Sequence, residues 1–238
     1  MSHELSRPLP PPKIARPVTA PPRRGRVLVL APHPDDEAIG PGATLVLHRR
    51  LGDPVDVLFV TTGEHGDNGG RMPATEYVAL RRREAEAAAR TLGVQRTDFW
   101  DYPDGMVVTE ADLAAVSARL TEHLVATRPD VVYAPHAGEQ HSDHHFVALA
   151  AQRAVQAARA RGAGPALLGY EVWSPLQPDW AVDVAAVYET KLAAIRCYKS
   201  QLERNDIPRA VDGLNRYRAV LLPPGGAYAE VFAEVGPT

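Results

Sequence analysis

Short apolar runs alternate with longer segments of helical spacing along most of this chain. Val27–Ala31, Val55–Thr62 and Asp130–Ala134 are rich in apolar and β-branched residues, which is typical of strands buried on both faces of a sheet. Gly40–Leu51 and Glu76–Leu92 have apolar residues at helical spacing, and each is followed by a glycine, a common helix end. The alternation predicts an α/β fold with a largely parallel, doubly wound sheet and helices on both faces. Strands over Thr97–Tyr102, Leu167–Trp173 and Tyr228–Phe232, and helices over Glu110–Thr127, Asp143–Arg161 and Val187–Tyr198, continue the pattern.

The length of 238 residues and an apolar content of 45% fit one large domain. No internal repeat or composition shift divides the chain after residue 25, so we expect a single domain over 26–238. Residues 1–25 carry repeated prolines and several arginines, and this composition predicts a disordered tail.

Charge and hydropathy bear on the partners and the location. The net charge of −3 gives no basic patch for nucleic acid. No apolar segment is long enough to span a membrane, and the N-terminus has no apolar signal core. Cys197 is the single cysteine, which fits a reducing compartment, so we expect a cytoplasmic protein. The sequence does not decide between a monomer and a homo-oligomer.

Two polar clusters lie just beyond the ends of predicted buried strands. Pro32-His33-Pro34-Asp35-Asp36-Glu37 follows the first strand directly, and His141-Ser142-Asp143-His144-His145 follows the strand that begins at Asp130. The carboxyl ends of parallel strands line the crevice in which open α/β sheets bind ligands. We therefore expect the two clusters to meet in one site.

The residue types in these clusters suit a metal ion. Zinc accepts histidine nitrogen and carboxylate oxygen, and catalytic zinc keeps three protein ligands and an open position. The spacing allows His33 and Asp36 to face one ion, with His144 as the third ligand. This set predicts Zn²⁺, and Fe²⁺, Co²⁺ or Mn²⁺ also accept it.

The neighbouring residues suit amide hydrolysis. Asp35 adjoins a ligand and is the candidate general base, and His141 is the candidate acid or oxyanion partner. Asp143 is expected to hold the His141 ring. A simpler interpretation of Asp-Asp-Glu is a solvated helix start, and a single histidine after a strand is more often structural. We favour the metal site because both clusters follow buried strands.

The motifs resemble the LmbE-like, or PIG-L-type, family of metal-dependent N-deacetylases. Its Ala-His-Pro-Asp-Asp-Glu signature corresponds to residues 31–37 and its His-Pro-Asp-His to residues 141–144, with Pro32 inserted and Ser142 in place of proline. Supporting similarity extends over Thr62-Gly63-Glu64, 81–93, 102–105, 170–173 and 191–201, so the resemblance covers about residues 26–235.

The resemblance implies a Rossmann-like fold, zinc on His33, Asp36 and His144, and the catalytic roles already given to Asp35 and His141. It also implies a small amino-sugar substrate, an N-acetylglucosamine group on a larger glycoside or lipid. Glu64, Asp67, Arg81 and Asp104 are candidate contacts to the sugar, although Arg81 with Glu84 also fits a surface ion pair.

Two other functions stay open: a metal-dependent amidase acting on a different amide, such as a thiol conjugate, and a binding protein without turnover. Asp35 and His141 argue against the second, because metal binding alone requires neither.

The pocket is expected to be shaped by loops over 63–75, 136–142, 174–183 and 203–227. Trp173, Trp180 and Leu176 are candidates to stack on a sugar or aglycone, and we favour a core position for Trp173.

Overall fold

A computed structural model describes residues 14–67, 70–105, 109–203 and 205–236. Its elements are β1 (Arg16–Val18), β2 (Val27–Ala31), α1 (Asp36–Ile39), α2 (Gly42–Arg50), β3 (Val55–Thr61), η1 (Glu64–Gly66), α3 (Ala74–Leu92), β4 (Arg96–Tyr102), α4 (Glu110–Thr127), β5 (Val131–Pro135), α5 (Ser142–Ala160), β6 (Ala166–Tyr170), β7 (Trp180–Asp183), η2 (Ala185–Val187), α6 (Tyr188–Ile195), α7 (Lys199–Leu202), α8 (Ile207–Arg218), η3 (Ala219–Leu221) and β8 (Ala229–Val235).

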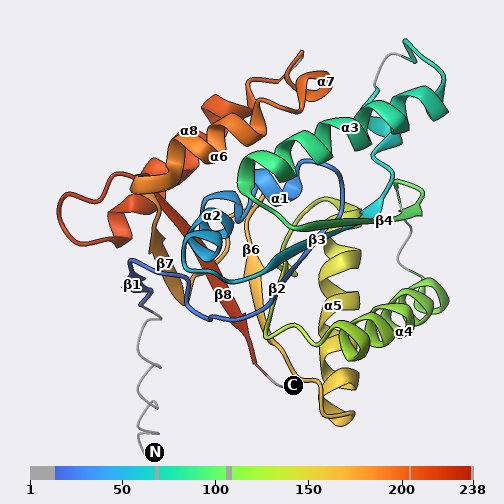
Figure 1. Cartoon of the computed structure of the whole chain (residues 1–238), viewed down its shortest axis with the longest axis horizontal. Coiled ribbons are helices and arrows are strands. Elements are labelled where there is room, and N and C mark those ends of the chain that lie inside the picture. The colour runs from blue at the N-terminus through green and yellow to red at the C-terminus, as the bar shows by residue number, and fades with distance from the viewer. Residues whose placement is uncertain (1–13, 68–69, 106–108, 204, 237–238) are drawn as a thin grey trace, which may run out of the picture.

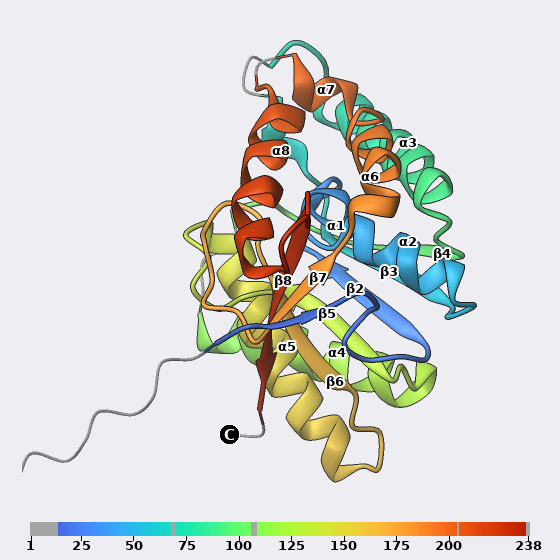
Figure 2. The same cartoon turned by 90° about the vertical axis from the view of Figure 1, so that its left-hand side faces the viewer.

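The strands form one eight-stranded sheet in the order β1-β7-β8-β6-β5-β2-β3-β4. Only β8, among the described strands, runs antiparallel to its neighbours, β6 and β7. Helices α1, α2, α3, α6 and α8 cover one face of the sheet, and α4 and α5 cover the other (Figures 1 and 2). The expected doubly wound, largely parallel sheet is confirmed.

Alternating side chains of the central strands build a core on each face. In β2 all residues are buried; Val27 and Val29 pack under the first helix layer, and Leu28 and Leu30 pack against α4 and α5. A strand buried on both faces needs apolar residues at every position. This explains the continuous apolar run that marked β2 in the sequence.

The order of the strands fixes where a ligand would bind. From β2 the chain moves outward to β3 and β4, then returns to the other side of β2 to form β5 and β6. The topological switch point therefore lies between β2 and β5, where open α/β sheets place their ligand crevice. The loops after these two strands carry the two polar clusters.

The segment before β2 differs from expectation. Arg16–Val18 forms the edge strand β1, which pairs in parallel with β7, and Ala15 is buried. Arg24 binds Asp53, with Nε 2.5 Å from Oδ2. Residues 14–25 are thus ordered on the domain rather than part of a disordered tail, because backbone pairing, an ion pair and the packing of Ala15 and Val18 fix the segment. Residues 1–13 of the expected tail lie outside the described residues.

The turn between α1 and α2 leaves no room for a side chain. A Cβ on Gly40 would lie 2.3 Å from the Tyr170 ring, and the Tyr170 hydroxyl donates to the carbonyl of Leu30 at 2.9 Å. Buried Lys191 donates to the carbonyl of Gly40 at 2.9 Å and to Glu230 at 2.6 Å. The turn that carries α1 is therefore fixed from both sides.

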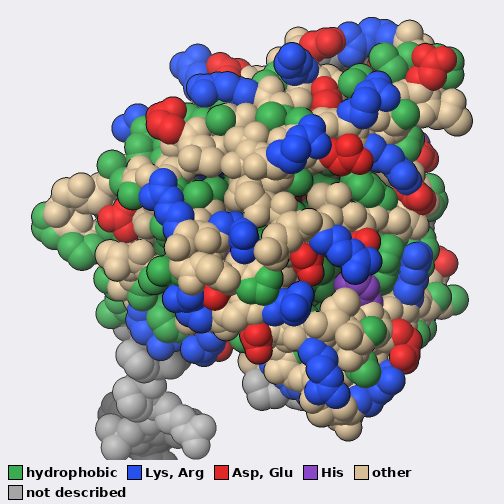
Figure 3. Space-filling model, viewed as in Figure 1, with side chains coloured by type: hydrophobic (Ala, Val, Ile, Leu, Met, Phe, Trp, Pro, Cys, Tyr) green, Lys and Arg blue, Asp and Glu red, His purple; other side chains and the backbone are tan. Residues whose placement is uncertain are grey.

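None of the helices that the structure describes is long and apolar enough to cross a membrane. On the face seen in Figure 3, Lys and Arg side chains are interspersed with Asp and Glu.

Candidate metal centre and active site

Three atoms from the two clusters meet at the switch point. Nδ1 of His33 lies 3.2 Å from Oδ2 of Asp36, and Nε2 of His144 lies 3.3 Å from each of these atoms. Ligands at about 2.0–2.1 Å from a tetrahedral zinc ion are about 3.3–3.4 Å apart. The triangle of donor atoms therefore fits one face of a zinc tetrahedron, and its set of two imidazoles and one carboxylate suits the ion. Ring nitrogens of His33, His141 and His144 also lie within 4.8 Å of one another, so His141 stands beside this triangle.

Each histidine of the triangle has a carboxylate at its other ring nitrogen. Nε2 of His33 lies 3.0 Å from Oδ2 of Asp143, and Nδ1 of His144 lies 3.5 Å from Oε2 of Glu139. Carboxylates in this position hold metal-ligating histidines in the right tautomer and orientation. The expectation that Asp143 holds His141 is not what the geometry shows, because the Asp143 carboxylate is 4.0 Å from that ring and lies against His33.

The carboxylates also set the protonation of the rings. Burial opposes a charge on His33 and His144, but neighbouring carboxylates raise the pKa of His33 to about 10 and that of His144 to about 9. Burial alone would raise the pKa of Asp36, and the two histidines lower it instead. The rings hold protons that a bound cation would displace, which couples metal binding to proton release.

Asp35 lies beside the triangle in a strained conformation. Its φ of 145° is in a region that residues with a side chain rarely adopt, and such strain is concentrated at functional sites. Its carboxylate is 3.2 Å from Nη2 of Arg81. Burial raises the pKa of Asp35 to about 6, against the opposing charge of Arg81.

The Asp-Asp-Glu run is not a solvated helix start. Asp36 and Glu37 are 1% and 0% exposed. Oε2 of Glu37 accepts from the backbone N–H of Asp35 at 3.2 Å, and Oε1 accepts from the Tyr198 hydroxyl at 2.5 Å. Burial raises the pKa of Glu37 to about 8, although the bond from Tyr198 lowers it. Glu37, which is itself held by Tyr198, therefore fixes the strained Asp35 backbone through the Asp35 N–H.

His141 is the N-cap of α5. Its Nδ1 accepts from the backbone N–H of Asp143 at 3.3 Å, so in the neutral ring Nε2 carries the proton. The ring centroid lies 4.8 Å from that of His33 and 4.9 Å from that of His144. Burial lowers the pKa of His141, and the charges of the other two histidines lower it further. The ring is thus a neutral hydrogen-bond donor beside the metal-binding atoms.

Both clusters fall within one known family pattern. The family model described as PIG-L, GlcNAc-PI de-N-acetylase, matches residues 28–155. The chain belongs to the PIG-L family.

Relatives of this PIG-L protein include enzymes of two chemistries. Diacetylchitobiose deacetylase of Thermococcus kodakarensis is 28% identical over 74% of this chain and 70% of its own. The structure of N,N'-diacetylchitobiose deacetylase from Pyrococcus horikoshii matches with a TM-score of 0.76 and 27% identity, over 88% of this chain and 83% of the other. A 4-oxalmesaconate hydratase of Pseudomonas putida is 28% identical over 73% of each chain. The family fold therefore carries hydrolysis and hydration, and the choice between them depends on the site.

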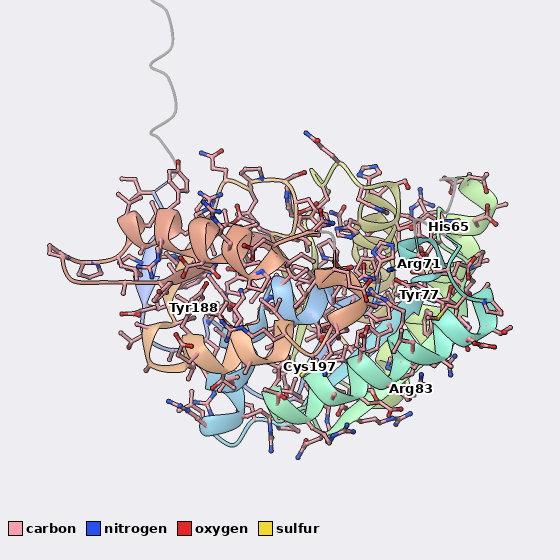
Figure 4. All side chains as sticks on the ribbon, turned by 90° about the horizontal axis from the view of Figure 1, so that it is seen from above. His65, Arg71, Tyr77, Arg83, Tyr188 and Cys197 are labelled. Carbon is pink, nitrogen blue, oxygen red and sulfur yellow. The ribbon has the colours of Figure 1, made fainter. Side chains whose placement is uncertain are left out.

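A cavity of ≈520 Å³ opens above the metal-binding atoms. His33, Asp35, Asp36 and His141 line it, and His144 is fully buried. The cavity lies at the N-terminal end of α3, where Figure 4 shows His65 and Tyr77; Cys197 lies near the other end of that helix. His65 lines the cavity, and it lies in the loop over 63–75 that was expected to shape the pocket.

The predicted substrate contacts divide into two groups. Arg81 and Asp104 line the cavity, whereas Glu64 and Asp67 do not. The Glu64 carboxylate accepts from Thr62 Oγ1, and Asp67 accepts from the backbone N–H of Arg71 at 2.8 Å. Both side chains bond within their own loop, whose residues 68–69 lie outside the described residues.

Arg81 is not part of a surface ion pair with Glu84. It is 2% exposed, and its Nε and Nη1 atoms have no hydrogen-bond partner among the residues that the structure describes. Glu84 accepts instead from the backbone N–H and hydroxyl of Ser200, at 2.9 and 2.6 Å. Arg81 thus holds Asp35 on one side and has unused donors in a cavity wall.

Sequence reasoning missed Glu139 and Tyr198 and gave Glu37 no role. Glu139 accepts from three successive backbone N–H groups, those of Val172, Trp173 and Ser174, at 2.8–3.3 Å. The only signal for these residues was their place in or beside segments that resemble the family.

Proposed function

We propose that this chain is a zinc-dependent N-deacetylase that removes the acetyl group from an N-acetylglucosamine-type glycoside. The observation that carries the proposal is the triangle of His33, Asp36 and His144 with buried Asp35 beside it in one cavity. The PIG-L membership and the deacetylases among the relatives support it. Nothing in the site favours the thiol-conjugate amidase or a protein without turnover, and the expected cytoplasmic location stays a prediction.

The donor atoms would hold zinc through Nδ1 of His33, Oδ2 of Asp36 and Nε2 of His144. Bound there, zinc supplies a Lewis acid for the acetyl carbonyl and lowers the pKa of water to about 7.

Asp35 is the general base of the proposed reaction. It takes a proton from the water that attacks the acetyl carbon. Its pKa of about 6 allows it to accept this proton and later to donate it near neutral pH. Arg81 keeps the carboxylate in place, and Glu37 keeps the backbone in place. The same carboxyl group returns the proton to the nitrogen as the C–N bond breaks, which releases acetate and the free amine.

His141 stabilises the tetrahedral intermediate. Its Nε2–H donates to the oxygen that carries the developing negative charge, and a fixed donor of this kind contributes most in a site closed to water. The ring needs no proton transfer in this role, which agrees with its lowered pKa.

The test combines metal analysis with acetate release. The purified protein is expected to contain about one zinc per chain and to release acetate from N,N'-diacetylchitobiose, with activity lost on treatment with 1,10-phenanthroline and regained with zinc. Asp35→Asn is the matched control, because it is expected to keep the metal and to remove the base. Hydration of an unsaturated tricarboxylate such as 4-oxalmesaconate, without acetate release from any amide, would replace the proposal with the hydratase chemistry.

A further inference from the structure

One aromatic side chain in the cavity differs from its surroundings. Trp173 is 51% exposed, and of the described residues that line the cavity it has the single large apolar side chain. The expectation of a core position for Trp173 is therefore wrong, whereas Trp180 and Leu176 are buried. The surrounding wall is polar and includes Asp104 and Gln201. An indole left open in a polar ligand cavity marks a contact for an apolar surface of the ligand.

The backbone of Trp173 is fixed to the metal centre. Its N–H and those of Val172 and Ser174 donate to the Glu139 carboxylate, which also lies 3.5 Å from Nδ1 of His144. One buried carboxylate therefore sets the orientation of a metal-binding ring and the position of the Trp173 backbone. The distance between that backbone and the ring is fixed before any ligand binds.

The other end of the same loop is also held. Glu171 accepts from the backbone N–H of Leu176 at 2.7 Å and forms a buried, bidentate ion pair with Arg218. Arg218 in turn donates to the carbonyl of Leu176 at 2.9 Å. A loop tied at both ends presents its exposed side chain with little loss of conformational entropy on binding.

We propose that Trp173 is the platform for a second sugar ring, so that the substrate is a glycoside in which another pyranose follows the acetylated sugar. The inference rests on the proposed function and adds the class of aglycone. A pyranose has a C–H face that packs on an indole and a rim of hydroxyls that bond to amides and carboxylates, such as Gln201 and Asp104. A lipid chain would meet one apolar side chain and an otherwise polar wall. A cavity of ≈520 Å³ is within the range of about 300–1,000 Å³ for sites of larger small molecules.

The test compares a disaccharide with a monosaccharide in two variants. Trp173→Ala is expected to raise KM for N,N'-diacetylchitobiose about tenfold, and to leave kcat/KM for N-acetylglucosamine within about twofold of the wild type. Trp173→Phe keeps an aromatic face, and its KM for N,N'-diacetylchitobiose is expected to lie close to that of the wild type. Tyr217→Ala, which removes an exposed aromatic side chain outside the cavity, is the matched control and should change neither substrate. Zinc content and Tm report whether any variant is damaged structurally.

A binding measurement separates this inference from the proposed function. Titration of the zinc-loaded Asp35→Asn protein with N,N'-diacetylchitobiose should change tryptophan fluorescence, and the double variant with Trp173→Phe should lose that change. If the wild-type protein releases no acetate but the fluorescence response of the Asp35→Asn protein depends on Trp173, the deacetylase assignment fails and the platform stands. Equal losses for both sugars in Trp173→Ala, no loss for either, or a fluorescence response independent of Trp173 would overturn the platform.

Discussion

The carboxylate of Glu139 lies 3.5 Å from Nδ1 of His144, on the side of the ring away from the other metal-binding atoms. The contact is long, yet both residues are buried and burial makes the charge costly unless it is balanced. Burial would raise the pKa of Glu139, and His144 together with the backbone N–H groups lowers it instead. Glu139 is therefore an anion that orients the His144 ring at its Nδ1 atom, opposite the nitrogen that faces the metal site.

Glu139→Gln tests that orientation. The neutral amide keeps the shape and one oxygen for the loop N–H groups but loses the charge behind His144. We expect zinc affinity to fall by about 10–100-fold, measured by competition with a chelator. Glu122→Gln, which alters an exposed carboxylate on α4, serves as the control. Unchanged affinity in Glu139→Gln would mean that the carboxylate only supports the loop.

Asp35 and Asp36 are expected to separate catalysis from metal binding. Asp35→Asn should lower kcat by about 10²–10⁴-fold, the usual contribution of a general base, with zinc content near that of the wild type. Asp36→Ala and His144→Ala should lose the metal. Elemental analysis beside acetate release gives both quantities. Zinc lost from Asp35→Asn and retained in Asp36→Ala would exchange the two roles.

Tyr198→Phe removes the hydroxyl that donates to Glu37. The buried Glu37 oxygen then lacks its partner, which should destabilise the fold by about 1–3 kcal/mol and loosen the Asp35 backbone. We expect kcat to fall while KM changes little, because the strained residue is the base and not a substrate contact. Tyr217→Phe, in an exposed position, is the control for loss of a hydroxyl. A rise in KM with constant kcat would contradict this positioning role.

His48 should make stability depend on pH. The ring is fully buried between Asp53 and the Tyr133 hydroxyl, and burial lowers its pKa although Asp53 opposes this. Below about pH 6.5 the unfolded chain binds a proton that the folded chain does not, so the free energy of unfolding falls as the pH decreases. The slope from this group is at most about 1.4 kcal/mol per pH unit.

Urea unfolding of wild type and His48→Gln between pH 7.5 and 5.5 would measure this contribution, with His65→Gln as a control for an exposed ring. The wild type should lose more stability on acidification than His48→Gln. Parallel curves for the two proteins would show that His48 does not titrate differently in the folded state.

The central sheet was predictable because the apolar pattern of each central strand reflects its burial on both faces. Val27–Ala31 forms β2 with the predicted bounds, since a strand buried on both faces must be apolar throughout. The short strands β1 and β7 were missed because three or four residues, with a proline in β1, carry no periodic pattern. Their conformation comes from pairing with each other and with β8.

The metal-binding triangle was predictable because its residues lie in the segments that follow two strands, β2 and β5, which are neighbours in the sheet. Trp173 was placed in the core because residues 167–173 were predicted to form one continuous strand. The strand ends at Tyr170, since Glu171 bonds to Arg218 and turns the chain. Contacts that join distant segments, such as Tyr198 to Glu37, leave no local pattern in the sequence.

The position of β8 has a consequence for the order of folding. This strand is the last that the structure describes, yet it lies inside the sheet between β6 and β7. The pair of β1 and β7 therefore has no neighbour in the sheet until residues 229–235 have left the ribosome. Helices and parallel strands up to β6 can assemble during synthesis, but the edge that begins at Arg16 joins them only when translation of the last strand is complete.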